Sequence, residues 1–216
     1  MTVSNRQQRL AGARLYFVCA AQPDSLLHDA LAGGVDIVQL RIKHGSDEEI
    51  LTAARRFRAV CDEHGALLII NDRPDLAVAV GADGVHVGQD DISVAAARAA
   101  VGPERLVGLS THTAAQVDAA NQAGIDYIGV GPVHATPTKP GRPAVGLDLV
   151  RHAAVHSSVP FFAIGGVDPG TVAAVREAGA RRVAVVRALS QARDPQATAR
   201  ELRATLSDPR TDAHAA

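Results

Sequence analysis

The stretch Ala123-Gly124-Ile125-Asp126-Tyr127-Ile128 ends an amphipathic segment and opens an apolar one. Gly is favoured just past a helix end, so this stretch predicts a helix stop followed by a short buried strand. A similar Ala-Gly-x-x-apolar pattern recurs at residues 32–37, 80–85 and 178–183. The four copies lie roughly 45 to 55 residues apart, which suits two strand–helix units per repeat.

Four double units make eight strands, and eight short apolar runs alternate with helical segments along the chain. They are residues 15–19, 36–41, 67–70, 84–87, 106–109, 127–130, 159–164 and 183–186. Such strands predict a parallel sheet buried on both faces. We therefore predict a single-domain α/β fold, a (β/α)₈ TIM barrel over residues 14–206, with an N-terminal tail at 1–13 and a disordered C-terminal tail at 207–216. The alternative is an open doubly wound sheet, but no Gly-x-Gly-x-x-Gly opens a helix.

Helix starts are predicted from capping residues. Ser46, with Glu49 three residues later, forms a capping-box pattern. Asp24 and Asp168 are further candidate N-caps, the latter followed by Pro169.

Composition excludes several classes of protein. The chain has 216 residues and a net charge of −1, which argues against a nucleic-acid partner. No apolar run reaches the length of about 18 residues that a membrane span needs, and the N-terminus has no apolar signal core. Cys19 and Cys61 give neither a disulfide framework nor a zinc spacing. We expect a soluble cytoplasmic protein with reduced thiols, and the sequence leaves open whether it forms a homo-oligomer.

The segment 131–142, which follows the sixth strand, contains too much Gly and Pro for a helix or a sheet ladder. It carries the hydroxyls of Thr136 and Thr138 and the cations of Lys139 and Arg142. Such groups on a stiff loop can bind an anionic ligand, although a solvated loop with chance charges is the alternative.

Polar groups also follow other strands, and in TIM barrels the site lies at the carboxyl ends of the strands. Gln39, Arg41 and Lys43 alternate along the second strand and so can point the same way. Asp72 and Asp91 follow the third and fourth strands. Two cations beside two carboxylates suit a diphosphate whose charge is shared with Mg²⁺, and the alternative is a structural ion-pair network.

A second anion site is predicted after the seventh strand. Gly165-Gly166 and the turn after the eighth strand can form the phosphate cradle common in these barrels, although a Gly-Gly turn also serves a backbone of positive φ. Two anion sites in one mouth suggest two phosphorylated substrates. One would carry a diphosphate leaving group, which points to a transferase that releases pyrophosphate.

Six motifs in register resemble the thiamine-phosphate synthase family. They are residues 39–43, 71–73, 84–91, 110–113, 131–139 and 163–166. The resemblance implies a Mg²⁺-dependent barrel enzyme of thiamine biosynthesis. It would condense 4-amino-2-methyl-5-(diphosphooxymethyl)pyrimidine with thiazole phosphate, by a dissociative mechanism, to give thiamine phosphate and pyrophosphate.

The resemblance also implies residue roles. The pyrimidine diphosphate would be held by Gln39, Leu40, Arg41, Ile42, Lys43, Asn71, Ser110 and Lys139. The thiazole phosphate would be held by Thr136, Pro137, Thr138, Gly166, Val186 and Arg187. Asp72 and Asp91 would bind Mg²⁺, and Arg41, Lys43, Ser110 and Lys139 would assist catalysis.

The chain departs from the family pattern at three positions. Arg187 stands where the family usually has Ser, and His134-Ala135 stand where an aromatic residue and Pro are expected. His86 is open to two interpretations, a packed strand-end histidine or a catalytic one. Two other functions remain: a thiazole tautomerase, in which Pro132 would be expected to be His, and an inactive sensor of thiamine intermediates, which would have lost the carboxylates.

Overall fold

The computed structural model describes residues 5–136 and 143–207. Eight parallel strands close into a barrel in sequence order, and β8 pairs with β1. The strands are β1 (Leu15–Cys19), β2 (Ile37–Leu40), β3 (Leu67–Asn71), β4 (Gly84–Val87), β5 (Leu106–Thr111), β6 (Tyr127–Val130), β7 (Phe161–Ile164) and β8 (Val183–Val185). The predicted TIM barrel is confirmed, and the open sheet is excluded.

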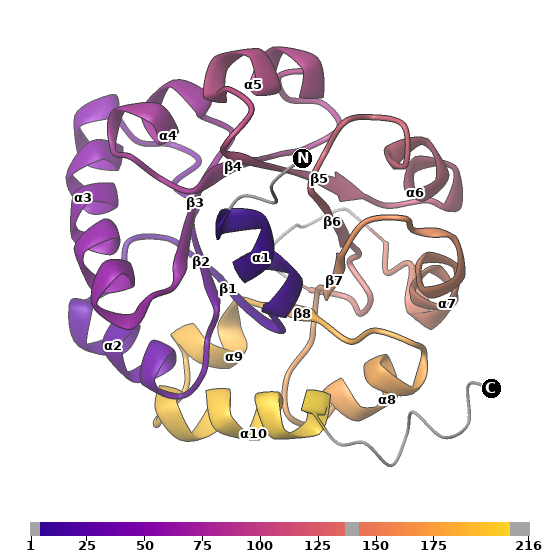
Figure 1. Cartoon of the computed structure of the whole chain (residues 1–216). Coiled ribbons are helices and arrows are strands. Elements are labelled where there is room, and N and C mark those ends of the chain that lie inside the picture. The colour runs from indigo at the N-terminus through magenta and orange to yellow at the C-terminus, as the bar shows by residue number, and fades with distance from the viewer. Residues whose placement is uncertain (1–4, 137–142, 208–216) are drawn as a thin grey trace.

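Helices surround the barrel as an outer ring (Figure 1). They are α1 (Asn5–Gly12), α2 (Asp24–Ala32), α3 (Asp47–His64), α4 (Pro74–Ala79), α5 (Val94–Val101), α6 (Ala114–Ala120), α7 (Gly146–His156), α8 (Val172–Glu177), α9 (Arg187–Ser190) and α10 (Pro195–Ser207). The exception is α1, which lies across one end of the barrel rather than in the ring (Figure 1).

Side chains alternate between two cores. Val38 and Leu40 of β2 join the larger core between strands and helices, whereas Ile37 joins the smaller core inside the barrel. Tyr16, Tyr127 and Phe162 form the inner core's aromatic centre, packed edge to face with ring centroids 5.3 to 5.9 Å apart. Because inward positions repeat every second residue, each strand has one inward side chain near its carboxyl end.

Three copies of the repeat place an Asp directly before an even-numbered strand, and each Asp contacts the preceding odd-numbered strand. Asp36 Oδ2 accepts from the backbone N–H of Leu15 at 3.0 Å. Asp83 and Asp126 accept equivalent bonds from Leu68 at 2.9 Å and Val107 at 2.8 Å. An Arg pairs with each carboxylate: Arg203 with Asp36, Arg58 with Asp83 and Arg98 with Asp126. The repeat therefore links neighbouring strands at the amino ends of the barrel.

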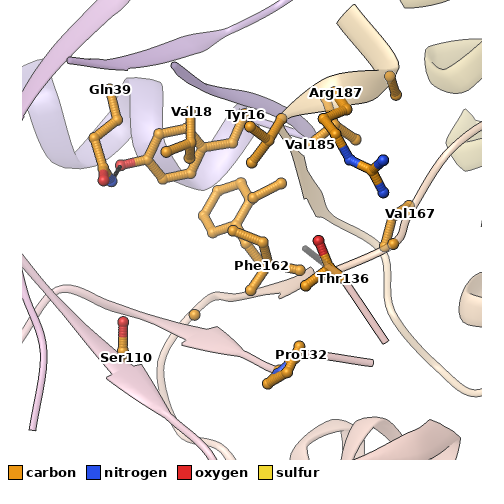
Figure 2. Close-up of a pocket in the computed structure, with 18 of the residues that line it drawn as sticks. Tyr16, Val18, Gln39, Ser110, Pro132, Thr136, Phe162, Val167, Val185 and Arg187 are labelled. Carbon is orange, nitrogen blue, oxygen red and sulfur yellow. Dashed lines mark hydrogen bonds between the residues drawn. The ribbon is translucent and has the colours of Figure 1, made fainter. Parts of the chain in front are cut away.

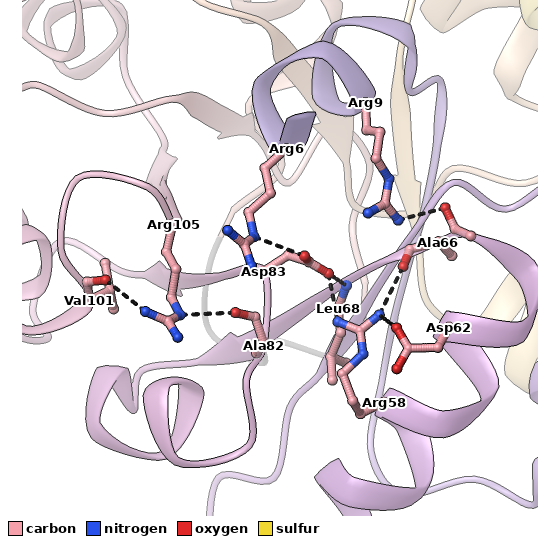
Figure 3. A network of polar contacts seen from close by, with 11 residues as sticks. Arg6, Arg9, Arg58, Asp62, Ala66, Leu68, Ala82, Asp83, Val101 and Arg105 are labelled. Atoms are coloured by element: carbon pink, nitrogen blue, oxygen red, sulfur yellow. Dashed lines mark hydrogen bonds and ion pairs between the residues drawn. The ribbon is translucent and has the colours of Figure 1, made fainter. Parts of the chain in front are cut away.

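The N-terminal segment is a correction to the sequence analysis, which assigned residues 1–13 to a tail. Residues 5–12 form α1, and its Leu10 is 3% exposed inside the barrel end. Arg6 Nε lies 3.0 Å from Asp83 Oδ1, and Arg9 donates to the carbonyl of Gly65 at 2.6 Å (Figure 3). A short polar helix with one buried Leu gives too weak an apolar pattern to distinguish it from a tail.

Two details of the helix boundaries also differ from the predictions, and a third agrees with them. The Ser46–Glu49 capping box is confirmed. Asp24, however, is the first residue of α2, and Pro23 is its N-cap. Asp168 caps a turn, because its Oδ1 accepts from the N–H groups of Gly170 and Thr171, and α8 begins later.

At the C-terminus, α10 includes Ser207, so the helix extends one residue beyond the predicted barrel boundary of 206. The rest of the predicted tail, 208–216, lies outside the described residues. The short helix α9 had no sequence prediction.

Candidate active site

A cavity of about 330 Å³ occupies the carboxyl end of the barrel, and all eight strands contribute to its lining. Near the top, the inward positions hold Val18, Gln39, Asn71, His86, Ser110, Gly129, Ile164 and Val186. The aromatic side chains of the inner core form its floor (Figure 2). The cavity therefore lies where the sequence placed the site.

A chain of hydrogen bonds crosses the floor. The side-chain amide of Gln39 donates to the Tyr16 hydroxyl at 2.6 Å, and the hydroxyls of Tyr16 and Tyr127 are 3.0 Å apart. Burial raises the pKa of both hydroxyls well above the ordinary value of tyrosine, so they stay protonated and can act as donors. Gly108 makes room for this arrangement, because a Cβ there would lie 2.2 Å from the Tyr127 ring.

His86 continues the chain towards the cavity wall. Its Nδ1 lies 3.3 Å from the Tyr127 hydroxyl, and its Nε2 lies 3.0 Å from Ser110 Oγ. The side chain is 9% exposed. His86 thus lies between the tyrosine floor and Ser110, and this geometry favours the packed, hydrogen-bonded interpretation over that of a reacting group.

The predicted charged cluster forms at the rim beside Asn71. Lys43 Nζ lies 2.6 Å from Asp72 Oδ2 and 3.9 Å from Asp91 Oδ1. Burial, opposed by Lys43 and reinforced by the neighbouring Asp91 carboxylate, raises the pKa of Asp72 above its ordinary value. Asp72 has a φ of 60°, an uncommon conformation for a residue other than Gly. A held pair of carboxylates is a donor set that suits a hard divalent cation.

The two arginines near this rim differ in their surroundings. Arg73 pairs with Asp47 and Asp75 on the outer surface, so it serves a structural ion-pair network. The Arg41 guanidinium has no hydrogen-bond or ion-pair partner within residues 5–136 and 143–207. The Arg41 guanidinium is therefore available to bind an anionic ligand.

Leu40 and Ile42 do not present side chains to the cavity. Leu40 is 1% exposed in the outer core, and Ile42 packs against the same core. Both alternate with Gln39 and Arg41, so the strand period turns them towards the helices. Any contact of theirs with a ligand would be made by the backbone.

The other side of the cavity is built by two glycines after β7. Gly165 and Gly166 have φ values of 101° and 64°, and a Cβ on Gly166 would lie 2.6 Å from His134 Cβ. The loop after β6 packs onto them, with the Val133 N–H donating to the Ile164 carbonyl at 2.8 Å and the His134 N–H to the Gly165 carbonyl at 2.9 Å. Glycine is required here for both the positive φ and the close approach.

The turn after β8 completes this side. Val186 and Arg187 line the cavity, and α9 begins at Arg187. Figure 2 shows the Arg187 side chain directed towards Val167 and Thr136, which also line the cavity. Pro137, Thr138, Lys139 and Arg142 lie outside the described residues.

The aromatic floor is not among the site residues predicted from the sequence. The chain has only two Tyr and four Phe residues, and both tyrosines with Phe162 meet inside the barrel. Their inward alternation with Val18 and Ile164 was the signal that could have identified them. Asp168 and Gln191 also line the cavity, but the sequence marks Asp168 only as a candidate helix cap, and Gln191 directly follows α9 at a position that no local pattern distinguishes.

Among the described residues, no helix is both long and apolar enough to cross a membrane.

A protein of Thermobifida fusca named thiamine-phosphate synthase is 51% identical over 207 residues, which cover 93% of this chain and 95% of that protein. One of the same name from Thermosynechococcus vestitus is 49% identical over 94% of this chain, but the match spans only 58% of that protein. The match likewise spans only 58% of the relative from Gloeobacter violaceus and 60% of the relative from Synechococcus sp..

A solved structure titled thiamine phosphate pyrophosphorylase from Pyrococcus furiosus is also similar. It is 30% identical, has a TM-score of 0.83, and the match covers 94% of this chain and 98% of that one. The family model described as thiamine monophosphate synthase matches residues 15–189, which include all eight strands. The chain therefore belongs to the thiamine monophosphate synthase family.

Proposed function

We propose that this chain condenses 4-amino-2-methyl-5-(diphosphooxymethyl)pyrimidine with thiazole phosphate to give thiamine phosphate and pyrophosphate. The observation that carries the proposal is that two different sets of groups able to bind anions follow the strands on opposite sides of one cavity. Charged side chains follow β2, β3 and β4, whereas glycines and a short helix follow β7 and β8. The names of the relatives support the same reaction.

In this proposal, the pyrimidine diphosphate occupies the side formed by β2 to β5. Gln39, Asn71 and Ser110 face the cavity and can hydrogen-bond to the aminopyrimidine. The cations of Arg41 and Lys43 hold the diphosphate, with Leu40 and Ile42 contributing backbone groups. Ser110 Oγ lies 3.0 Å from His86 Nε2, and this hydrogen bond holds the Ser110 side chain in place.

Asp72 and Asp91 would hold Mg²⁺ at this side. Their carboxylates are hard oxygen donors close to one cation, and Mg²⁺ in proteins takes one or two carboxylates together with substrate phosphates. When bound, the metal would neutralise charge on the departing diphosphate. The chain contributes the two carboxylates in fixed positions, since Asp91 Oδ2 also accepts from the Gly88 N–H at 2.8 Å.

The thiazole phosphate would occupy the opposite side. The first N–H groups of α9 have no acceptor within their own helix, so they can bind phosphate oxygens together with Gly166. Arg187 adds a guanidinium that can bind phosphate with two hydrogen bonds. We assign Thr136, Pro137 and Thr138 to the thiazole, as the family resemblance implies.

The chain's residues suit a dissociative reaction. Lys43 and, in our proposal, Lys139 stabilise the leaving diphosphate by charge. The floor of Tyr16, Tyr127 and Phe162 excludes water from the pyrimidine-methyl cation until the thiazole nitrogen attacks it. The step needs no strong general base, and the hydroxyls on the floor stay protonated.

The tautomerase alternative lacks its expected His, because Pro132 occupies that place beside the cavity. It also gives no role to the cluster of Lys43, Asp72 and Asp91. The sensor alternative would not need that cluster either. The proposed reaction uses all three groups and is therefore preferred.

The test is to mix the purified chain with both substrates and to measure thiamine phosphate and pyrophosphate with and without Mg²⁺. We expect both products in equal amounts and only with Mg²⁺. Isomerisation of a thiazole phosphate without pyrophosphate release would establish the tautomerase instead. Binding of both substrates without product would establish the sensor.

The proposal takes small phosphorylated molecules as the partners and the cytoplasm as the location. Both cysteines are free, which agrees with a reducing compartment. Burial raises the pKa of the Cys61 thiol to about 12 and raises the pKa of the Cys19 thiol well above its ordinary value. Neither cysteine is therefore suited to act as a nucleophile.

A further inference from the structure

Three side chains that can ligate metals meet on the outer surface between α6 and α7. They are Asp118 of α6 and His152 and His156 of α7, and their ligating atoms all lie within 4.8 Å of one another. His152 Nε2 is 2.7 Å from Asp118 Oδ1. In the part of the chain that the structure describes, no other trio of His, Cys, Asp and Glu side chains meets this criterion.

Local structure already holds the three groups together. His152 and His156 are four residues apart and so lie one turn apart on the same helix face. Their rings stack with centroids 4.3 Å apart. Asn121, just after α6, donates to the His156 carbonyl at 2.8 Å and accepts from the Ser158 N–H at 2.8 Å, which fixes the end of α6 against the end of α7.

We propose that Asp118, His152 and His156 form a site for a divalent first-row transition metal of the Zn²⁺ type. Two imidazoles and one carboxylate suit such a metal, which would complete its coordination with water. Ligand atoms around a tetrahedral zinc stand roughly 3.4 Å apart, given bonds of about 2.1 Å. The metal therefore replaces the proton between His152 and Asp118 after a small side-chain movement. Mg²⁺ prefers an all-oxygen site and is not the occupant.

The site lies away from the cavity. Each helix of the ring runs back from the carboxyl end of one strand to the amino end of the next, so the last turns of α6 and α7 are at the far end of the barrel. Bound metal would join the two helices and leave the substrates untouched. We expect a gain in thermal stability without a change in turnover.

The experiment titrates Zn²⁺ into the untagged full chain by calorimetry, with excess Mg²⁺ present to occupy the carboxylates at the rim. We expect one Zn²⁺ site, at least tenfold weaker in His152→Ala and in His156→Ala, and weakened in Asp118→Asn. Zn²⁺ should raise the Tm of the wild type but not of the His variants. Co²⁺ at this site should give a visible absorption band that both His variants lose.

The matched control is the double variant His28→Ala/His64→Ala, which removes another close histidine pair, with ring nitrogens 3.0 Å apart. It should bind Zn²⁺ as the wild type does. Equal isotherms for the wild type and His152→Ala would overturn the proposal, as would loss of binding in the control alone. Because all three ligands lie on the helix ring, the turnover of each variant should equal that of the wild type. Normal turnover then shows that the variant is folded.

Discussion

At the scale of single residues, Asp72 combines two unusual properties. Its backbone has a φ of 60°, and its carboxylate lies between Lys43 and Asp91. Asn tolerates this conformation better than most residues, so Asp72→Asn removes the charge while keeping the backbone. We expect kcat to fall by about 100-fold or more, because a metal ligand is lost. The fall should be measured across a Mg²⁺ titration.

The control for this change is Asp90→Asn. Asp90 is an exposed neighbour of Asp91 to which we assign no role, so the variant should keep its activity and its Mg²⁺ dependence. If Asp72→Asn retained normal turnover at limiting Mg²⁺, Asp72 would not be a metal ligand.

Tyr127 is the residue through which the floor of the cavity reaches Ser110. Its hydroxyl contacts both the Tyr16 hydroxyl and His86 Nδ1. Tyr127→Phe leaves these buried groups without one partner, so we expect a loss of about 1 to 3 kcal/mol in the free energy of unfolding. Urea denaturation measures that loss.

Kinetics separate a positioning role of Tyr127 from a purely structural one. If the hydroxyl also positions Ser110 through His86, kcat should fall in Tyr127→Phe while KM for thiazole phosphate is unchanged. Ser110→Ala should then make the Tyr127 substitution kinetically silent. A normal kcat in folded Tyr127→Phe would limit the hydrogen-bond chain to stability.

At the scale of elements, Asp83 links β3, α1 and α3 (Figure 3). Burial opposes its ionisation, but hydrogen bonds from Arg58, the Leu68 N–H and Arg6 lower its pKa below the ordinary value. Asp83→Asn removes the buried anionic partner of Arg58, which then keeps only the exposed Asp62 carboxylate and the Ala66 carbonyl, so we expect a loss of about 3 kcal/mol in stability at pH 7. Arg6→Ala, which removes a more exposed partner, should cost no more than about 1 kcal/mol.

The pH dependence of the Asp83 link follows from the direction of this shift. Because the folded pKa is lower than the unfolded one, the link stabilises fully above the unfolded pKa of about 3.9. Its contribution is lost as the pH falls through the folded pKa. The stability difference between the wild type and Asp83→Asn should therefore shrink in acid. A difference independent of pH from 7 to 3 would exclude the carboxylate charge as its source.

At the scale of the whole molecule, the order of strands could be predicted because the repeat marks each helix stop and each buried strand. The meeting of Lys43 with Asp72 and Asp91 could be predicted because each residue closely follows a buried strand, and the carboxyl ends of the strands share one end of the barrel. The contact between Tyr16 and Tyr127 could not be predicted from the pattern of either strand, because the two residues become neighbours only when β1 and β6 face each other across the closed barrel. The role of α1 was missed for the same reason, since Arg6 and Asp83 are far apart in sequence.

The two sides of the cavity yield a prediction about the molecule as a whole. Asp72 follows β3 and Arg187 follows β8, three strand steps apart around the barrel, and within residues 5–136 and 143–207 they share no hydrogen-bond or ion-pair partner. The effects of Asp72→Asn and Arg187→Ala on the free energy of activation, taken from kcat/KM, should therefore add within about 0.5 kcal/mol. Arg187→Ala alone should raise KM for thiazole phosphate and leave KM for the pyrimidine diphosphate unchanged.

The comparison pair is Asp72→Asn with Lys43→Ala. These side chains are 2.6 Å apart and serve the same diphosphate in our proposal. Their effects should depart from additivity by about 0.5 to 3 kcal/mol, because either change already disrupts the shared cluster. Coupling between Asp72 and Arg187 as large as that between Asp72 and Lys43 would mean that one anion spans the cavity. The assignment of two phosphorylated substrates to two sides would then be wrong, even with the barrel and the family unchanged.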